Sequence, residues 1–250
     1  ANCTFSGNSA EGNGGGMGND TYSNPTLTNC TFSGNRSGGA GAGICNTYNS
    51  SPTLANCTFT GNSAEDDGGG MYNWVQSEPT LTNCILWLNS DAGGMDESAQ
   101  IHNAGGTTAV DYSCIQGWTG SLGGVGNIGD YPQLVAGYYL AQRAAGQPVE
   151  SLCVDAGDPT SEMIDGTTRT DGVQDAGVVD MGYHYPGPAC FGDMNGDGAR
   201  NITDFTLFAS AYGSQVGDAN FNPYADLTGN GYVNMTDFTV FAPYYGVPCP

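Results

Sequence analysis

Short apolar segments recur along the first half of the chain at a fixed spacing. The segment 2–8 returns at 29–35 and at 56–62, and a looser copy occupies 83–89, so the spacing is 27 residues. None of these segments is long or periodic enough to form a helix. Self-similarity at such a period is the sequence signature of a solenoid, in which each repeat stacks on its neighbour.

Two further motifs keep the same spacing. A Gly-rich turn leads into an aliphatic residue at Met17, Ile44 and Met71, and a Pro-Thr-Leu element ends at Leu27, Leu54 and Leu81. Each repeat therefore holds three short extended segments separated by Gly, Asn and Pro turns. This pattern predicts a mainly β fold, a right-handed parallel β-helix with three short strands per coil and coils about 4.8 Å apart.

Equivalent side chains of successive coils should stack in ladders. The expected apolar ladders are Cys3–Cys30–Cys57–Cys84, Phe5–Phe32–Phe59–Leu86 and Leu27–Leu54–Leu81. Asparagines recur at two corners, where an amide ladder can satisfy backbone groups in every coil: Asn8–Asn35–Asn62–Asn89 and Asn19–Asn46–Asn73. We interpret all these ladders as core architecture and not as binding sites.

The Phe-x-x-Asn and Gly-Gly-aliphatic elements resemble repeats of the polymorphic outer-membrane proteins. More broadly, they are similar to secreted bacterial β-helix proteins of the pectate-lyase-like type. The resemblance covers residues 1–118, and residues 119–189 are irregular, as expected of a C-terminal cap of the solenoid. The chain begins inside a repeat, so either residues precede it or something covers the exposed first coil.

The last 60 residues contain two copies of a calcium-loop pattern. Side chains with oxygen donors stand at loop positions 1, 3, 5, 9 and 12, and the backbone carbonyl of position 7 completes the set of calcium ligands. Position 6, where the loop turns sharply, is Gly198 in the first copy and Gly231 in the second. The expected ligands are Asp193, Asn195, Asp197, Ala199, Asn201 and Asp204, then Asp226, Thr228, Asn230, Tyr232, Asn234 and Asp237. The second copy carries fewer acids, so we expect it to bind calcium more weakly. The alternative is a pair of Asx-rich turns without a metal.

A short helix is expected after each loop, at 205–212 and at 238–245, with a glycine just beyond its end. This duplicated loop–helix unit, at 190–250, resembles a type I dockerin. The resemblance implies a cohesin-like partner, recognised in dockerins often through loop positions 10 and 11, which are Ile202-Thr203 and Met235-Thr236 here. Cys190 and Cys249 bracket the module, and a disulfide between them would join its two ends.

Charge and cysteine usage narrow the function further. The chain has no lysine, four arginines and 25 acidic residues, a net charge of −21. This composition excludes nucleic acids and anionic membrane surfaces as partners, and no segment is apolar enough to enter a membrane. Together with the calcium loops and the expected disulfide, it predicts a secreted or cell-surface bacterial protein, with Ala1 as a mature N-terminus. Pairing among the other seven cysteines and glycosylation of the Asn-x-Ser/Thr sites stay open.

Three functions are compatible with these features. The leading hypothesis is a structural or adhesive protein that associates head to tail with copies of itself through its open β-helix end, stabilised by calcium, as a filament or surface layer. The alternative is a dockerin-bearing subunit that docks a cohesin and binds or modifies a polysaccharide. The third is a polysaccharide lyase or hydrolase. We expect no catalysis. In the repeats, Arg36 and the isolated His102 are the only basic side chains, and the acidic residues of the repeats lie mostly at turns.

Overall fold

The computed structural model describes residues 1–135, 137–187, 189–195 and 198–249. Its contacts divide the chain into two compact units. The solenoid unit comprises Ala1–Asp130, Asp155–Glu162 and Val178–Tyr183, and the C-terminal unit comprises Tyr131–Val154, Met163–Gly177 and His184–Pro250. The stretch 119–189 is thus shared between the two units, and the domain boundaries expected from the sequence stay a prediction.

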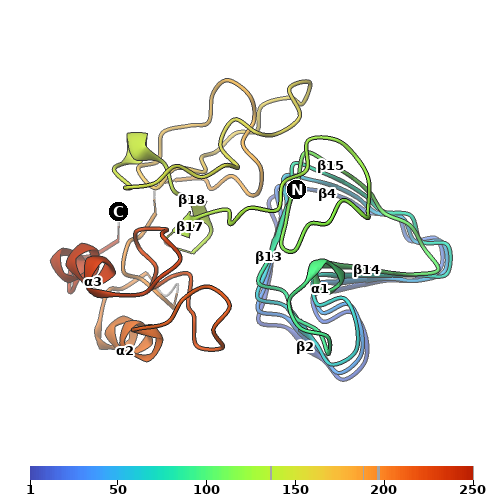
Figure 1. Ribbon diagram of the computed structural model, residues 1–250, viewed down its shortest axis with the longest axis horizontal. Coiled ribbons are helices and arrows are strands. Elements are labelled where there is room, and N and C mark those ends of the chain that lie inside the picture. Colours follow the sequence, from blue (N-terminus) through green and yellow to red (C-terminus); the bar gives the residue numbers. More distant parts are fainter. Residues whose placement is uncertain (136, 188, 196–197, 250) are drawn as a thin grey trace. The chain divides into compact units, whose positions relative to one another are not determined.

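The solenoid unit is a parallel β-helix, as the repeat predicts (Figure 1). Its three main sheets contain β1 (Thr4–Ser6), β5 (Thr31–Ser33), β9 (Thr58–Thr60), β13 (Ile85–Trp87) and β16 (Cys114–Ile115); β3 (Met17–Asn19), β7 (Ile44–Asn46), β11 (Met71–Trp74) and β14 (Ile101–Ala104); and β4 (Thr26–Thr28), β8 (Thr53–Ala55), β12 (Thr80–Thr82) and β15 (Ala109–Asp111). A minor sheet adds the two-residue strands β2 (Ser9–Ala10), β6 (Arg36–Ser37) and β10 (Ser63–Ala64).

The repeat fixes the register until the fourth coil. Phe5 pairs with Phe32 and Phe32 with Phe59, each 27 residues apart. The short helix α1 (Glu97–Gln100), which the sequence did not predict, then lengthens the coil, so that Tyr72 pairs with His102. The chain turns between β15 and β16, where Tyr112 adopts a left-handed conformation with φ of 47°.

The expected apolar ladders form the core of the solenoid. The rings of Phe5, Phe32 and Phe59 stack with centroids 4.5 and 4.6 Å apart and planes within 3° of parallel. The leucine ladder and the cysteines of the second, third and fourth coils are buried with them, whereas Cys3 of the first coil is exposed. Trp118 and Leu122 pack against the same core and follow its last strand.

The asparagine ladders satisfy polar groups inside the solenoid without using charge. The side-chain amide of Asn62 donates to Oδ1 of Asn89 at 2.8 Å and to the carbonyl of Phe32 at 2.9 Å. Its own Oδ1 accepts from the backbone and side-chain N–H groups of Asn35 at 3.0 and 2.8 Å. The second ladder runs through Asn19, Asn46, Asn73 and Asn103 with side-chain bonds of 2.8–3.0 Å.

The C-terminal unit combines a hairpin with two helices. The antiparallel strands β17 (Leu134–Val135) and β18 (Tyr139–Leu140) precede the 3₁₀ turn η1 (Arg143–Ala145), the helices α2 (Ile202–Ala211) and α3 (Met235–Phe241), and the 3₁₀ turn η2 (Ala242–Tyr244). Phe208 and Phe241 stack at 5.8 Å in its core. No helix in the described part of the chain is long and apolar enough to cross a membrane.

Both helices begin three residues earlier than the sequence analysis placed them. Asn201 and Asn234 are the N-caps, and each forms a capping box with the aspartate three residues later. A capping box satisfies donors at both sides of a helix start, so the helix begins directly after the asparagine. The predicted helix 238–245 also ends early, because the chain tightens into η2 after Phe241.

Replacing Asn62 by alanine should destabilise the solenoid, because two buried N–H groups of Asn35 would lose their acceptor. We expect the free energy of unfolding to fall by about 3 kcal/mol. Urea denaturation followed by tryptophan fluorescence measures this unit alone, since Trp74, Trp87 and Trp118 all belong to it. The exposed Asn24→Ala is the matched control, with an expected change below about 1 kcal/mol, and equal effects of the two variants would contradict the ladder argument.

Candidate metal centre

The second loop gathers three oxygen-bearing side chains in a buried position. Asp237, at the start of α3, accepts bonds through Oδ1 from the backbone N–H and hydroxyl of Thr228, at 3.0 and 2.9 Å, and through Oδ2 from the N–H of Asn234 at 2.9 Å. Asp226 accepts bonds from the N–H groups of Asn230 at 3.2 Å and Gly231 at 2.7 Å. Asp226, Thr228 and Asp237 are all buried. The loop thus brings together the residues that the sequence placed at positions 1, 3 and 12.

Electrostatics make this cluster suited to a cation. Burial, together with the neighbouring Asp237 carboxylate, raises the pKa of Asp226 to about 7, against the lowering effect of the N–H bond from Gly231. Among the described residues, neither carboxylate forms an ion pair with a basic side chain. Two buried carboxylates side by side are unfavourable unless an opposite charge balances them. Calcium is a hard cation that takes oxygen ligands, so this donor set fits it.

The first loop repeats the arrangement. The Asp204 carboxylate is buried and accepts bonds from the N–H groups of Met194 and Asn201, both at 2.8 Å. Asp193 accepts a bond from the N–H of Gly198 at 2.8 Å, as Asp226 does from Gly231. The carboxylates of positions 1 and 12 are therefore held in the same way in both loops. Asp197 lies outside the described residues, so its place in the first site stays a prediction.

The remaining predicted ligands lie at the rim of the loops. Asn195, Ala199, Asn230 and Tyr232 are exposed, and Tyr232 was expected to contribute its backbone carbonyl only. The side-chain oxygens of Asn201 and Asn234 accept bonds from Thr203 and Thr236 at 2.8 Å, so these asparagines cap α2 and α3 in the structure. Their role as metal ligands stays a prediction.

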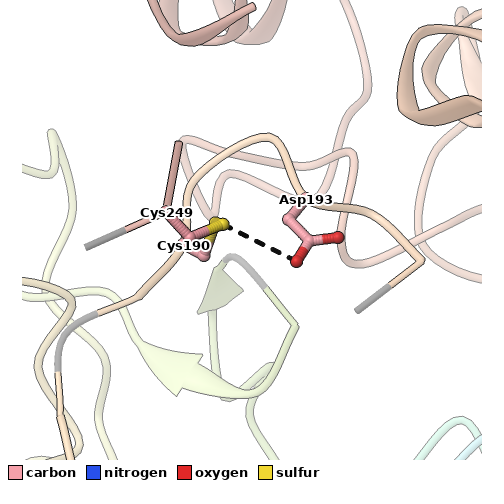
Figure 2. A group of neighbouring side chains, drawn as sticks. All are labelled: Cys190, Asp193 and Cys249. Carbon is pink, nitrogen blue, oxygen red and sulfur yellow. Dashed lines mark hydrogen bonds between the residues drawn. A yellow bond between two sulfur atoms is a disulfide. The ribbon is translucent and has the colours of Figure 1, made fainter. Parts of the chain in front are cut away.

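The predicted disulfide between Cys190 and Cys249 is present, with Cα atoms 5.3 Å apart. Figure 2 shows that Asp193 lies beside it, with an Oδ 3.8 Å from Sγ of Cys249. A disulfide sulfur has no thiolate charge to offer a metal, so this trio does not form a separate thiolate site. The other seven cysteines form no disulfide in the described part of the chain: Cys3, Cys30, Cys45, Cys57, Cys84, Cys114 and Cys153.

Both histidines have acidic partners, including His102, which the sequence analysis treated as isolated. Nδ1 of His102 lies 3.6 Å from Asp67, and its ring stacks on Tyr72. His184 is buried with Asp175 at 2.9 Å. His102 and Asp67 are 35 residues apart and meet only because coils stack, which explains why no local pattern indicates the pair.

One contact to the second loop was also missed. The hydroxyl of Tyr131 lies 3.4 Å from Oδ2 of Asp226, 95 residues along the chain. No motif links the two positions in the sequence.

Two family models match separate parts of the chain. Residues 1–116 match the family described as right handed beta helix region, and residues 191–244 match the dockerin type I domain. The chain therefore has a β-solenoid similar to right-handed β-helix regions and a C-terminal module similar to type I dockerin domains. No curated protein and no solved structure gives a significant match to the chain. Dockerin type I domains bind calcium, dock onto cohesins and occur in extracellular cellulosome components.

Proposed function

We propose that this protein is an extracellular subunit whose dockerin folds around two calcium ions and docks a cohesin, with the β-helix as its cargo. The observation that carries the proposal is the duplicated carboxylate arrangement. In each loop, a buried aspartate at the helix start and an aspartate at position 1 are held by backbone N–H groups at matching positions.

Two calcium ions would complete these loops. The first ion would be held by Asp193, Asn195, Asp197, Asn201, Asp204 and the Ala199 carbonyl, and the second by Asp226, Thr228, Asn230, Asn234, Asp237 and the Tyr232 carbonyl. Each ion would add positive charge beside the aspartates of its loop. Metal binding would therefore stabilise the folded C-terminal unit directly.

The helices of the dockerin expose apolar side chains at equivalent positions. Ile202 opens α2 and is 64% exposed, and Met235 opens α3 and is 59% exposed. Ile202, Phe205, Phe238, Phe241, Ala242 and Tyr245 line a hollow of about 390 Å³. Exposed apolar surface of this kind marks protein–protein contact sites. These side chains are the proposed cohesin contact, in agreement with loop position 10 as a recognition position.

Docking should depend on both the surface and the metal. We expect the full chain to bind at least one member of a panel of type I cohesins in millimolar calcium, and to lose binding in chelator. The double variant Ile202→Asp/Met235→Asp should weaken the affinity at least about tenfold, measured by biolayer interferometry, because it buries charge in an apolar contact.

The control for docking is Val125→Asp, which alters an exposed apolar residue of the solenoid and should bind as the parent does. Failure of the parent to bind any cohesin, with oligomers forming instead in sedimentation, would contradict docking. That outcome would support the head-to-tail self-association expected from the sequence, which stays a prediction.

The β-helix offers a surface for a polysaccharide. Tyr22, Tyr48 and Trp74 are exposed at one corner of successive coils, by 71%, 45% and 40%, and the rings of Tyr48 and Trp74 lie 5.2 Å apart. A hollow of about 460 Å³ beside them is lined by Trp74, Tyr72, Asp67 and other residues. Aromatic faces provide large contact area for sugar rings, and nearby polar groups can bond their hydroxyls. A polysaccharide is therefore the ligand that we propose for the solenoid.

Trp74→Ala should abolish this binding. Affinity electrophoresis against a panel of soluble neutral and acidic polysaccharides should show at least one that retards the parent and no longer retards the variant. Tyr212→Ala, which removes an exposed aromatic ring from the C-terminal unit, should leave the retardation unchanged. If no polysaccharide retards the parent, the ligand assignment is wrong.

A further inference from the structure

The second calcium loop is covered by a part of the chain that lies outside the dockerin match. The hairpin β17–β18 packs on the loop turn at Gly229, which is buried. A Cβ atom at Gly229 would lie 2.5 Å from Cγ1 of Val135 and 3.0 Å from Cβ of Ala141. The hairpin and the loop backbone are therefore in direct contact, with no room for a side chain between them.

Two tyrosine contacts extend this interface. The ring of Tyr224, just before the loop, lies against Tyr138 with centroids 5.3 Å apart, and a Cβ at Gly137 would lie 2.4 Å from Tyr224. Tyr131, just before β17, directs its hydroxyl to Oδ2 of Asp226 at 3.4 Å. A phenol is protonated at neutral pH, so it donates this bond. The hairpin segment thus contacts both the backbone of the loop and one of its carboxylates.

The first loop differs at the equivalent places. A Cβ at Gly198 would meet no described atom within 4 Å, whereas one at its counterpart Gly231 would lie 3.3 Å from Val216 and 3.5 Å from the Tyr131 ring. Asp193 is partly exposed, and Asp226 is fully buried. The two loops share the bonds from positions 6 and 9 to the aspartates of positions 1 and 12, and their surroundings differ, so the first loop is an internal reference for the second.

We propose that residues 131–135 and 137–141 are part of the second calcium site, with Tyr131 as the residue that positions Asp226. The proposal rests on the proposed calcium function of the dockerin. The hairpin holds the loop turn at Gly229 in place, and the Tyr131 hydroxyl fixes the orientation of the Asp226 carboxylate toward the metal. Groups that orient metal ligands are commonly as important for affinity as the ligands' own geometry.

The coupling has two consequences. Calcium binding at the second loop stabilises the hairpin by the same factor by which the folded hairpin strengthens calcium binding, since linkage is reciprocal. The functional calcium unit also begins near residue 131, whereas the family match begins at 191. The second loop has Asn230 where the first has the carboxylate of Asp197, and it gains from the hairpin the rigidity that this extra charge supplies in the first loop.

Calorimetric titration of calcium into the full chain tests the proposal. Tyr131→Phe removes only the hydroxyl, and it should raise the calcium Kd of one site about tenfold, the lower end of the effect of losing a ligand-orienting group. The other site should keep the parent affinity. The Asp193→Ala background, which removes a ligand of the first loop, assigns the affected site to the second.

The matched control is Tyr139→Phe. This tyrosine lies on the same hairpin and donates its hydroxyl to the carbonyl of Gly187 at 2.8 Å, so the variant removes a tyrosine bond that does not involve the loop. It should leave both affinities unchanged. If the hairpin only stabilised the fold, Tyr131→Phe and Tyr139→Phe would change the calcium affinities by the same amount.

Gly229→Ala provides a second test that does not involve a hydroxyl. Its control is Gly198→Ala in the first loop, which stands at loop position 6 whereas Gly229 stands at position 4; both glycines are left-handed, with φ of 82° and 70°. Both variants place a side chain on a left-handed backbone, and only Gly229→Ala also collides with the hairpin. It should therefore weaken its own site more than Gly198→Ala weakens the first site.

The possible outcomes separate the two claims. Calcium heat in the parent with unchanged affinities in Tyr131→Phe and equal losses in the two glycine variants would overturn this inference and leave the dockerin function intact. Absence of any calcium heat in the parent would overturn the proposed function and this inference together.

Discussion

In the C-terminal unit, three buried aspartates form no ion pair with any basic side chain among the described residues. Asp204, Asp226 and Asp237 are buried, and the chain has no lysine and four arginines. Arg200 of this unit donates to the carbonyl of Pro248 and lies over the ring of Tyr244. Backbone N–H groups compensate the carboxylates in part, and a dication would supply the charge that remains. Asp204 and Asp237 also complete the capping boxes at the starts of α2 and α3, so the helix starts depend on how these aspartates are held.

In the solenoid, the buried polar groups are satisfied by hydrogen bonds between neighbouring coils. Its buried corners carry asparagines, whose amides are neutral and can both donate and accept, so each coil satisfies the next. The stack needs no cation, and its stability comes from repeated apolar ladders and amide bonds. The two units therefore respond differently to metal: the solenoid should be indifferent to calcium, and the dockerin should depend on it.

The sequence was informative wherever a contact repeats or lies within a short motif. The 27-residue spacing predicted the strands, the Phe5–Phe32–Phe59 stack and the asparagine ladders, because the same contact occurs in every coil. The bracketing cysteines predicted their own disulfide. The helix starts were misplaced because Asn201 and Asn234 were assigned as metal ligands only, although asparagine with an aspartate three residues later is a capping-box pattern.

Contacts between unrelated segments could not be predicted. Tyr131 and Asp226 are 95 residues apart, and nothing in the composition of the hairpin distinguishes it from other irregular parts of 119–189. The same holds for His102 and Asp67, which meet through the stacking of coils at a place where α1 has changed the spacing. Such pairs depend on tertiary geometry alone.

The central claim is that calcium supplies the charge on which the fold of the dockerin depends. Hydrogen–deuterium exchange of the full chain, read by mass spectrometry in calcium and in chelator, tests it most directly. The account predicts that chelator strongly accelerates exchange in α2 and α3 and leaves the strands β5 and β9 of the solenoid unchanged. Helices that stay equally protected in chelator would contradict it.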